Sequence, residues 1–360
     1  MQVTKLPDWV YRDCAAPSQP HRKRALDRQN ALTKPAGALG RLEALAIDLA
    51  GLQATEQPRA RLAPIIVFAG DHGVAAQGVS AYPQDVTVAM MANFASGGAA
   101  ISVLARELSC KLEVVDAGSR AVVPVAGTVS DKPRCGSRDF SVCQALDSSD
   151  VRFAFECGQR AVERAIGGQP DLLILGEMGI GNTTSAAAIA AALLGVEAAM
   201  VAGNGTGLDA AGRARKAAII DMALSDYGLR DGGASSEWIL EAVGGLEITA
   251  LCGAVIAAAQ AGLPVLVDGF IVSVAALAAT KINPSCRPYL LFSHRSAEEG
   301  HRRVLDALKA RPLLDLDLRL GEGSGAALAL PILRLACALH NEMATFAEAA
   351  VPDRALVTRT

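Results

Sequence analysis

The stretch "DLLILGEMGIGNTTSAAAIAAALLG" (residues 171–195) carries the pattern on which the fold prediction rests. Its apolar run, Leu172–Leu175, has the length of a short buried strand, and the closely spaced glycines that follow predict a turn. The Ala-rich remainder predicts a helix, whose N-cap we expect at Asn182, Thr183 or Thr184. The stretch therefore predicts a strand, a tight glycine turn and a helix in succession.

This glycine turn has two alternative roles. Free N–H groups at a helix start suit an anion such as phosphate, which makes Gly179, Gly181 and Asn182 candidate substrate-binding residues. The alternative is purely structural, a helix start preceded by permissive glycines. Glu177 would repel a phosphate at this place, so we expect it to face another part of a ligand, such as ribose hydroxyls.

Similar apolar runs recur along the chain between Ala-rich stretches. This alternation predicts an α/β fold, a doubly wound, Rossmann-like parallel sheet with helices on both faces. The runs that we expect to form strands lie at 63–73, 111–120, 171–182, 198–207, 263–270 and 289–296.

Each run ends in glycine together with polar or charged residues. Open parallel sheets bind ligands in a crevice beyond the carboxyl ends of their strands. We therefore expect these endings to share one site, although each side chain could instead serve its own loop. The residues expected to converge are Asp71, His72, Glu177, Asn182, Asp268 and Ser296.

A second glycine-rich turn precedes a predicted helix in "VAGNGTGLDAAGRARKAAII" (201–220). It matches neither the P-loop pattern nor G-x-G-x-x-G, so a dinucleotide site has weak support. Gly203 and Gly205 are candidate phosphate-binding residues. Lys216 follows on the helix, where it could reach a phosphate or lie exposed as most lysines do.

The segment "AGDHGVAAQGVSAYPQDVT" (69–87) raises the question of a metal, because it contains Asp71-His72. No second His or Cys lies at ligand spacing, so we expect no metal site. Tyr82 and Gln84 are candidate pocket residues, an apolar plate and an amide donor, with an ordinary loop as the alternative.

One carboxylate lies between glycines in "PLLDLDLRLGEGSGAALALP" (312–331). Glycines let the backbone turn tightly and approach a ligand closely. Glu322, flanked by Gly321 and Gly323, could therefore do acid–base work, or it could be a solvated loop residue.

Composition narrows the class of protein. The 360 residues carry a net charge of −3 and no long basic run, so nothing favours nucleic-acid binding. The eight cysteines include no C-x-x-C pair, which argues against a disulfide framework. The N-terminus lacks the apolar core of a signal peptide, so we expect a cytoplasmic protein. Gly262-Leu263-Pro264 divides the apolar segment 248–279, which favours a buried helix and strand over a membrane span.

The ends of the chain differ from its middle. We expect a large α/β catalytic domain at 31–330 and a small helical subdomain made of 1–30 together with 331–360. Residues 325–350 predict one long helix with a kink at Pro331. The polar segment 126–148 is interpreted as an excursion from the core.

Taken together, these segments resemble the nicotinate mononucleotide:dimethylbenzimidazole phosphoribosyltransferases of cobalamin nucleotide-loop assembly. The matching strings run in the family's order over most of the chain; 126–148 and the termini depart from it. The strings are "LTKPAGALGRLE" (32–43), "FAGDHGVAAQGVSAYPQDVT" (68–87), "GEMGIGNTT" (176–184), "GNGTGLD" (203–209), "LVDGFI" (266–271), "SHRSAE" (293–298) and "LRLGEGSGAA" (318–327).

The resemblance implies a reaction and an assembly. Phosphoribose would move from nicotinate mononucleotide to 5,6-dimethylbenzimidazole, giving α-ribazole 5′-phosphate and nicotinate with inversion at the anomeric carbon. The resemblance also implies a homodimer, and no cofactor is expected.

Roles follow from the resemblance and from this chemistry. The family's general base falls on Glu322, which would take the proton of the acceptor nitrogen. Glu177 and Asp268 would stabilise an oxocarbenium-like transition state or hold ribose hydroxyls. Further candidates are Gly179, Gly181, Gly203, Gly205, Lys216 and Ser296 for the 5′-phosphate, and Gln84 and Leu320 for the acceptor base.

Three other classes of protein stay open at this point. A nucleotide-dependent dehydrogenase is disfavoured by the missing G-x-G-x-x-G. A protein that binds a base or nucleotide without turnover leaves the carboxylate between glycines poorly explained. A membrane protein would rest on the apolar segment 248–279 alone.

Overall fold

The computed structural model describes residues 5–205 and 207–352. The chain forms two compact units, Met1–Ala15 with Ala63–Ala329 and Ala16–Leu62 with Leu330–Thr360. These bounds differ from the expected domains, because residues 31–62 cluster with the terminal unit. The first residues belong instead to the sheet unit, where Asn283 Nδ2 donates to Val10 O at 2.9 Å and Tyr289 donates to Ala15 O at 2.9 Å.

A six-stranded parallel sheet forms the centre of the first unit, in the order β3-β2-β1-β4-β5-β6. This order confirms the doubly wound prediction. The strands are β1 (Ile65–Gly70), β2 (Leu112–Gly118), β3 (Val129–Ser130), β4 (Leu173–Met178), β5 (Val265–Val267) and β6 (Leu290–Phe292). A separate parallel pair, β7 (His294–Arg295) and β8 (Leu314–Asp315), follows β6.

Two expectations about the sheet need correction. The described residues of the run 198–207 form no strand but a 3-10 turn, η3 (Ala198–Met200), followed by a loop. Gly205 and Gly207 take positive φ of 52° and 119°, which breaks an extended conformation. The segment 126–148, interpreted as an excursion, instead supplies the edge strand β3.

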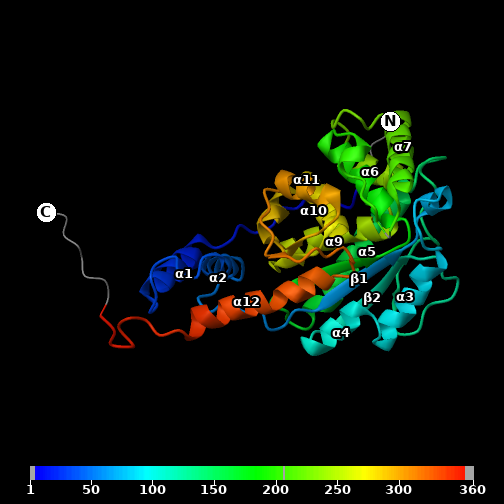
Figure 1. Cartoon of the computed structure of the whole chain (residues 1–360). Helices are drawn as coiled ribbons and strands as arrows, with labels where there is room; N and C mark the ends of the chain where they lie inside the picture. Colours follow the sequence, from blue (N-terminus) through cyan, green and yellow to red (C-terminus); the bar gives the residue numbers. More distant parts are fainter. Residues whose placement is uncertain (1–4, 206, 353–360) are drawn as a thin grey trace. The chain divides into compact units, whose positions relative to one another are not determined.

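Helices cover both faces of the sheet. Figure 1 shows α3 (Asp85–Ser96) and α4 (Ala100–Glu107) on one side of β1 and β2, with α5 (Ser148–Ile166) and α9 (Leu246–Gln260) on the other. The pair α5 and α9 packs backbone to backbone, because a Cβ at Gly158 would overlap Ala250 O and one at Gly253 would overlap Phe155 O. Small residues in an Ala-rich and Gly-rich chain allow this approach.

This unit contains five further helices and three further 3-10 turns within the described residues. They are α6 (Asn182–Leu194), α7 (Ala210–Asp226), α8 (Ser236–Val243), α10 (Phe270–Ile282) and α11 (Glu299–Ala307), with 3-10 turns η1 (Asp8–Tyr11), η2 (Gly73–Gln77) and η4 (Pro284–Tyr289).

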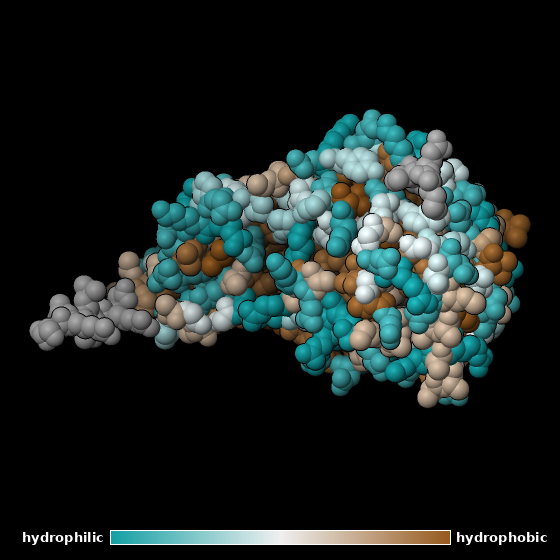
Figure 2. Space-filling model, turned by 90° about the horizontal axis from the view of Figure 1, so that it is seen from above, coloured by the Kyte–Doolittle hydropathy of each residue, from teal (hydrophilic) through white to brown (hydrophobic). Residues whose placement is uncertain are grey.

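The apolar segment 248–279 divides into α9, β5 and α10, as predicted. Within the described ranges, one helical segment, Asp85–Glu107, is long and apolar enough to cross a membrane by length and composition, a test that core helices of soluble proteins also pass. On the face shown in Figure 2, hydrophobic and hydrophilic residues are intermixed.

The second unit contains α1 (Gln19–Ala31), α2 (Arg41–Leu52) and the later part of α12 (Ser324–Glu342). The buried side chains of Gln29 and His340 hydrogen-bond at 2.9 Å, and Lys34 pairs with Glu43 at 2.8 Å. The predicted C-terminal helix is confirmed through Pro331 but ends at Glu342, short of residue 350.

Candidate active site

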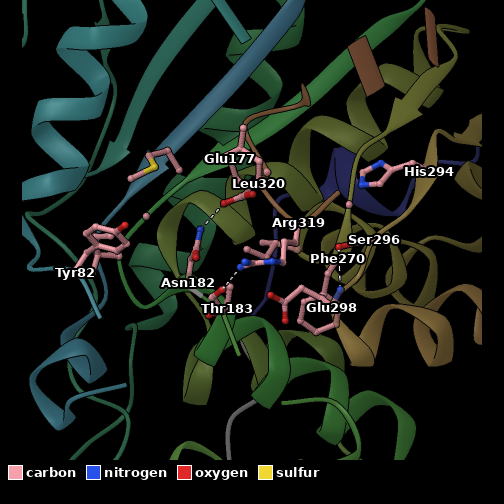
Figure 3. Close-up of a pocket in the computed structure, with 17 residues that line it drawn as sticks. Tyr82, Glu177, Asn182, Thr183, Phe270, His294, Ser296, Glu298, Arg319 and Leu320 are labelled. Atoms are coloured by element: carbon pink, nitrogen blue, oxygen red, sulfur yellow. Dashed lines mark hydrogen bonds between the residues drawn. The ribbon is translucent and has the colours of Figure 1, made fainter. Parts of the chain in front are cut away.

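A cavity of about 260 Å³ opens beyond the carboxyl ends of β4, β5 and β6. Its position is the crevice expected for a doubly wound sheet. Figure 3 shows Glu177, Asn182, Arg319 and Ser296 around it, with Tyr82 apart from the others. The expected site residues that line it are Tyr82, Glu177, Gly179, Asn182, Gly205, Ser296 and Leu320.

Glu177 belongs to β4 and supplies a buried carboxylate to the cavity wall. Its Oε2 accepts a hydrogen bond from the Asn182 side chain. Burial raises the pKa of Glu177 well above its ordinary value, and the nearby carboxylates of Asp268 and Glu322 add to the rise. This wall therefore favours a cationic group on a ligand.

Asn182 is not the N-cap that we expected. The helix α6 starts at Asn182, and its N-cap is Gly181 in the left-handed conformation, with φ of 96°. Glycine takes this conformation at little cost. Because Gly181 occupies the N-cap position, the Asn182 side chain does not cap the helix and donates to Glu177 instead.

The turn that carries Glu322 packs directly against β4. Gly321, Glu322 and Gly323 have successive φ values of 83°, 64° and 84°. Such angles cost a non-glycine residue roughly 1–2 kcal/mol, so the flanking glycines confine that cost to Glu322. A Cβ at Gly176 would overlap the Glu322 backbone, and one at Gly321 would overlap Glu177 Oε1.

The Glu322 side chain is 5% exposed and does not line the cavity, although its neighbours Leu320 and Gly321 do. Its Oε2 accepts a hydrogen bond from Ile101 N, in the first turn of α4, at 3.3 Å. Burial raises the pKa of Glu322, and this hydrogen bond opposes the rise.

Asp268 follows β5, and its two carboxylate oxygens are bound to backbone rather than offered to the cavity. Oδ2 accepts from Gly323 N at 3.2 Å and Oδ1 from Ala326 N at 2.9 Å. These bonds satisfy amides at the start of α12 and hold the Glu322 turn. We expected Asp268 at the ligand; the structure buries it beside His294, at 3.8 Å.

Lys216 is wholly buried, which excludes the exposed alternative. Its Nζ donates to Thr183 Oγ1 at 2.9 Å and to Gly203 O at 3.5 Å, one layer behind the cavity wall. Because the ammonium occupies a Thr183 lone pair, the Thr183 hydroxyl hydrogen is available to a ligand. Burial lowers the pKa of Lys216 to about 8, and Glu298 opposes the shift.

Ser296 lines the cavity and is held by His301. Ser296 N donates to His301 Nδ1 at 2.8 Å, so His301 Nε2 carries the hydrogen that reaches Ser273 Oγ at 2.9 Å. Burial lowers the pKa of His301 to about 3, and the ring stays neutral. Ser296 Oγ accepts from Glu298 N at 3.2 Å, which leaves its own hydrogen for a ligand.

Two of the three residues expected around the acceptor base line the cavity, and the third does not. Tyr82 and Leu320 line the cavity with exposed fractions of 55% and 59%. Gln84 does not line it: its Nε2 donates to His72 O at 2.7 Å, and its Oε1 accepts from Arg120 at 2.6 Å.

Asp71 and His72 are buried supports and do not line the cavity. His72 Nε2 lies 2.6 Å from Glu247 Oε1, and its Nδ1 lies 2.9 Å from Ser185 Oγ. Among the residues that the structure describes, no group of three or more His, Cys, Asp or Glu side chains is placed to hold a metal ion.

Several cavity residues were missed by the sequence analysis. Thr183, His294 and Glu298 lay within strings quoted for the family resemblance, but their distances to the wall were invisible in the sequence. Arg319 precedes Leu320, and its Nη1 donates to Gly205 O at 3.4 Å. Phe270, in the loop-to-helix junction after β5, completes this side of the wall.

The groups around the cavity include both kinds of charge. Lys216 and Arg319 lie around the Gly203–Gly205 segment together with the carboxyl of Glu298, whereas Glu177 lies at the end of β4. Such a site suits a small molecule with an anionic group at one end and a positive centre at the other.

Comparison with known proteins defines the class first. A family model described as phosphoribosyltransferase matches residues 14–351, so the chain is a phosphoribosyltransferase. The nicotinate-nucleotide–dimethylbenzimidazole phosphoribosyltransferase of Bradyrhizobium diazoefficiens is 68% identical, over 97% of this chain and 99% of the relative. That of Pseudomonas aeruginosa PAO1 is 55% identical, over 96% and 98%.

A solved structure agrees with these relatives. The crystal structure of the Thermus thermophilus enzyme of the same description is 42% identical, with a TM-score of 0.88, and covers 94% of this chain and 100% of that one. The chain belongs to the nicotinate-nucleotide–dimethylbenzimidazole phosphoribosyltransferase family.

Proposed function

We propose that the chain transfers phosphoribose from nicotinate mononucleotide to 5,6-dimethylbenzimidazole, giving α-ribazole 5′-phosphate and nicotinate in cobalamin biosynthesis. Family membership supports the substrates. The observation that carries the proposal is the pair of cationic groups at the Gly203–Gly205 segment, Arg319 on the cavity wall and Lys216 behind it, with the Glu177 carboxyl at the end of β4. Nicotinate mononucleotide has the matching form, an anionic phosphate and a cationic pyridinium joined by ribose.

The leaving group needs no help from an acid. Nicotinate starts as a pyridinium and departs as a neutral ring nitrogen, so the electron pair of the broken C–N bond neutralises it. The acceptor nitrogen attacks the opposite face of the anomeric carbon, and a single displacement inverts the configuration. Its partner N–H must then lose a proton, which requires one base.

Glu322 is the base in this proposal. Ile101 N holds Oε2, and no donor in the described part of the chain binds Oε1, which is therefore free to accept a proton. The raised pKa of Glu322 brings it closer to the working pH, which improves a general base. Its φ of 64° is held between two glycines in a turn that packs against Gly176 of β4, so the carboxylate is presented from a fixed backbone.

Glu177 stabilises the positive charge that develops on ribose. It lines the cavity, and Asn182 fixes its Oε2. An arriving cation lowers its pKa and favours the ionised form. Asp268 contributes by holding the Glu322 turn rather than by touching the sugar, because its oxygens are bound to Gly323 N and Ala326 N.

The phosphate binds between two glycine turns. Gly179 and Gly181 belong to the first turn, Gly203 and Gly205 to the second, and Lys216 lies behind them. Hydroxyls of Thr183 and Ser296 have hydrogens left to donate, because their oxygens already accept from Lys216 Nζ and Glu298 N. Tyr82 and Leu320 border the acceptor base, whereas Gln84 supports this side through its bonds to His72 O and Arg120.

We also propose that the protein acts as a cytoplasmic homodimer without a cofactor, which the family resemblance supports. The direct test is to incubate the purified protein with both substrates and follow both products by mass spectrometry. Nicotinate and α-ribazole phosphate formed in equal amounts would support the proposal. Tight nucleotide binding without products would indicate a binding protein instead.

A further inference from the structure

We propose that Thr87 is a positioning residue that holds the glycine turn 179–181 in its ligand-binding conformation. The inference rests on the proposed function, in which this turn binds the nucleotide phosphate. Thr87 lies in the first half of α3, is wholly buried and is not a cavity residue, so it would act on a ligand only through the turn.

One hydrogen bond joins Thr87 to the turn. Ile180 N donates to Thr87 Oγ1 at 3.1 Å, and Thr87 Oγ1 donates to Asp71 Oδ1 at 2.7 Å. The Thr87 hydroxyl has one hydrogen to donate, and Asp71 Oδ1 is the acceptor that it reaches. The Thr87 hydrogen is thus committed to Asp71, and its lone pair faces the Ile180 amide.

Asp71 extends this link to a third strand. Its Oδ2 accepts from Arg120 N at 2.8 Å. Asp71 follows β1, Arg120 lies beyond β2, and Ile180 lies beyond β4, and these three strands are neighbours in the sheet. A single hydroxyl and carboxylate therefore tie together three strand ends, and a buried polar group left unpaired there would be costly.

The turn needs such a link because glycines surround its one side chain. Gly181 has a positive φ of 96°, and a Cβ at Gly179 would overlap Gly70 O. Both positions require glycine, and glycine has the most conformational freedom to lose. Holding the Ile180 amide fixes the peptide plane between Gly179 and Ile180, so this part of the turn is ordered before an anion arrives. Ile180 itself lines the cavity.

The test compares T87V, which keeps the shape but loses the hydroxyl, with T87S, which keeps the hydroxyl. We expect T87V to raise the KM for nicotinate mononucleotide by about tenfold while kcat at saturation changes less than about threefold, because a turn that is no longer held must be ordered at the expense of binding. T87S should restore KM to within about threefold of the wild type.

T249V is the matched control. Thr249 is also wholly buried, but its hydroxyl donates to Gly245 O, the residue before its own helix α9, at 2.7 Å. It should lose stability without raising KM. A T87V KM equal to that of the wild type, or a rise shared by T249V, would overturn the role of Thr87. A wild-type protein that binds no nucleotide would overturn the proposed function itself.

A measurement on the wild type needs no variant and covers the case in which T87V fails to fold. Hydrogen exchange without nucleotide should show the Ile180 amide protected, because Thr87 holds it. Protection at Gly179 and Gly181 should increase only when nicotinate mononucleotide is added. An Ile180 amide that exchanges as fast as in an unfolded chain contradicts the proposal.

Discussion

Asp268 Oδ2 accepts a hydrogen bond from Gly323 N at 3.2 Å, and this bond connects the end of β5 to the turn that presents Glu322. Asp268 Oδ1 accepts from Ala326 N at 2.9 Å, so neither oxygen is left without a backbone partner. A residue bound in this way affects the reaction by fixing where the Glu322 carboxylate lies.

A double-mutant cycle separates this indirect role from a direct one. In D268N, an amide NH₂ replaces one of the two carboxylate oxygens, so either Gly323 N or Ala326 N loses its acceptor. We expect the turn to shift and kcat to fall about tenfold or more. Because Asp268 acts through Glu322, the double variant D268N/E322Q should be no slower than E322Q alone.

The control for this cycle is D116N. Asp116 is another buried carboxylate, paired with Lys132 at 2.6 Å near the edge of the sheet. Its loss should lower stability without changing kcat. Additive losses in D268N/E322Q would show that Asp268 touches the substrate, and the catalytic role first expected for it would return.

Lys216 should govern nucleotide affinity rather than turnover. K216M keeps most of the buried volume but removes the charge and the bond to Thr183 Oγ1. We expect the KM for nicotinate mononucleotide to rise about tenfold or more with kcat nearly unchanged, because losing the charge behind the wall and the bond that orients the Thr183 hydroxyl weakens phosphate binding equally before and during reaction. Steady-state kinetics with K281M, an exposed lysine on α10, provide the control.

The pH dependence of KM follows from the same residue. Burial lowers the pKa of Lys216 to about 8, so the ammonium is charged below this pH and neutral above it. Nucleotide binding should therefore weaken as pH rises through about 8, and the trend should be absent in K216M. A wild-type KM that stays constant from pH 7 to about 9.5 would argue against a charged Lys216 in binding.

Much of the fold was predictable because its signal is local. The strands β1, β2, β4, β5 and β6 are short apolar runs followed by glycine or polar residues, a pattern that the sequence displays directly. The run 198–207 misled because its apolar residues resemble a strand, whereas the positive φ of Gly205 and Gly207 depends on the folded loop. The edge strand β3 has two residues, too few for a periodic pattern.

The sequence indicated which residues gather near the site better than it indicated what their side chains contact. Glu177 and Ser296 line one cavity, because strand ends converge in a parallel sheet, and their roles there stay predictions. The sequence could not show that Gln84 Nε2 and Asp268 Oδ2 bind backbone groups, since those partners, His72 O and Gly323 N, are brought near only by the fold. The burial of Lys216 likewise depends on tertiary packing.

The turnover number of E322Q at saturating concentrations of both substrates decides the role of Glu322 as general base. Glutamine keeps the size and an acceptor for Ile101 N but cannot take a proton at working pH. We predict that kcat for nicotinate release falls by about 10²–10⁴-fold while the KM for nicotinate mononucleotide changes little. Turnover close to that of the wild type would contradict the assignment.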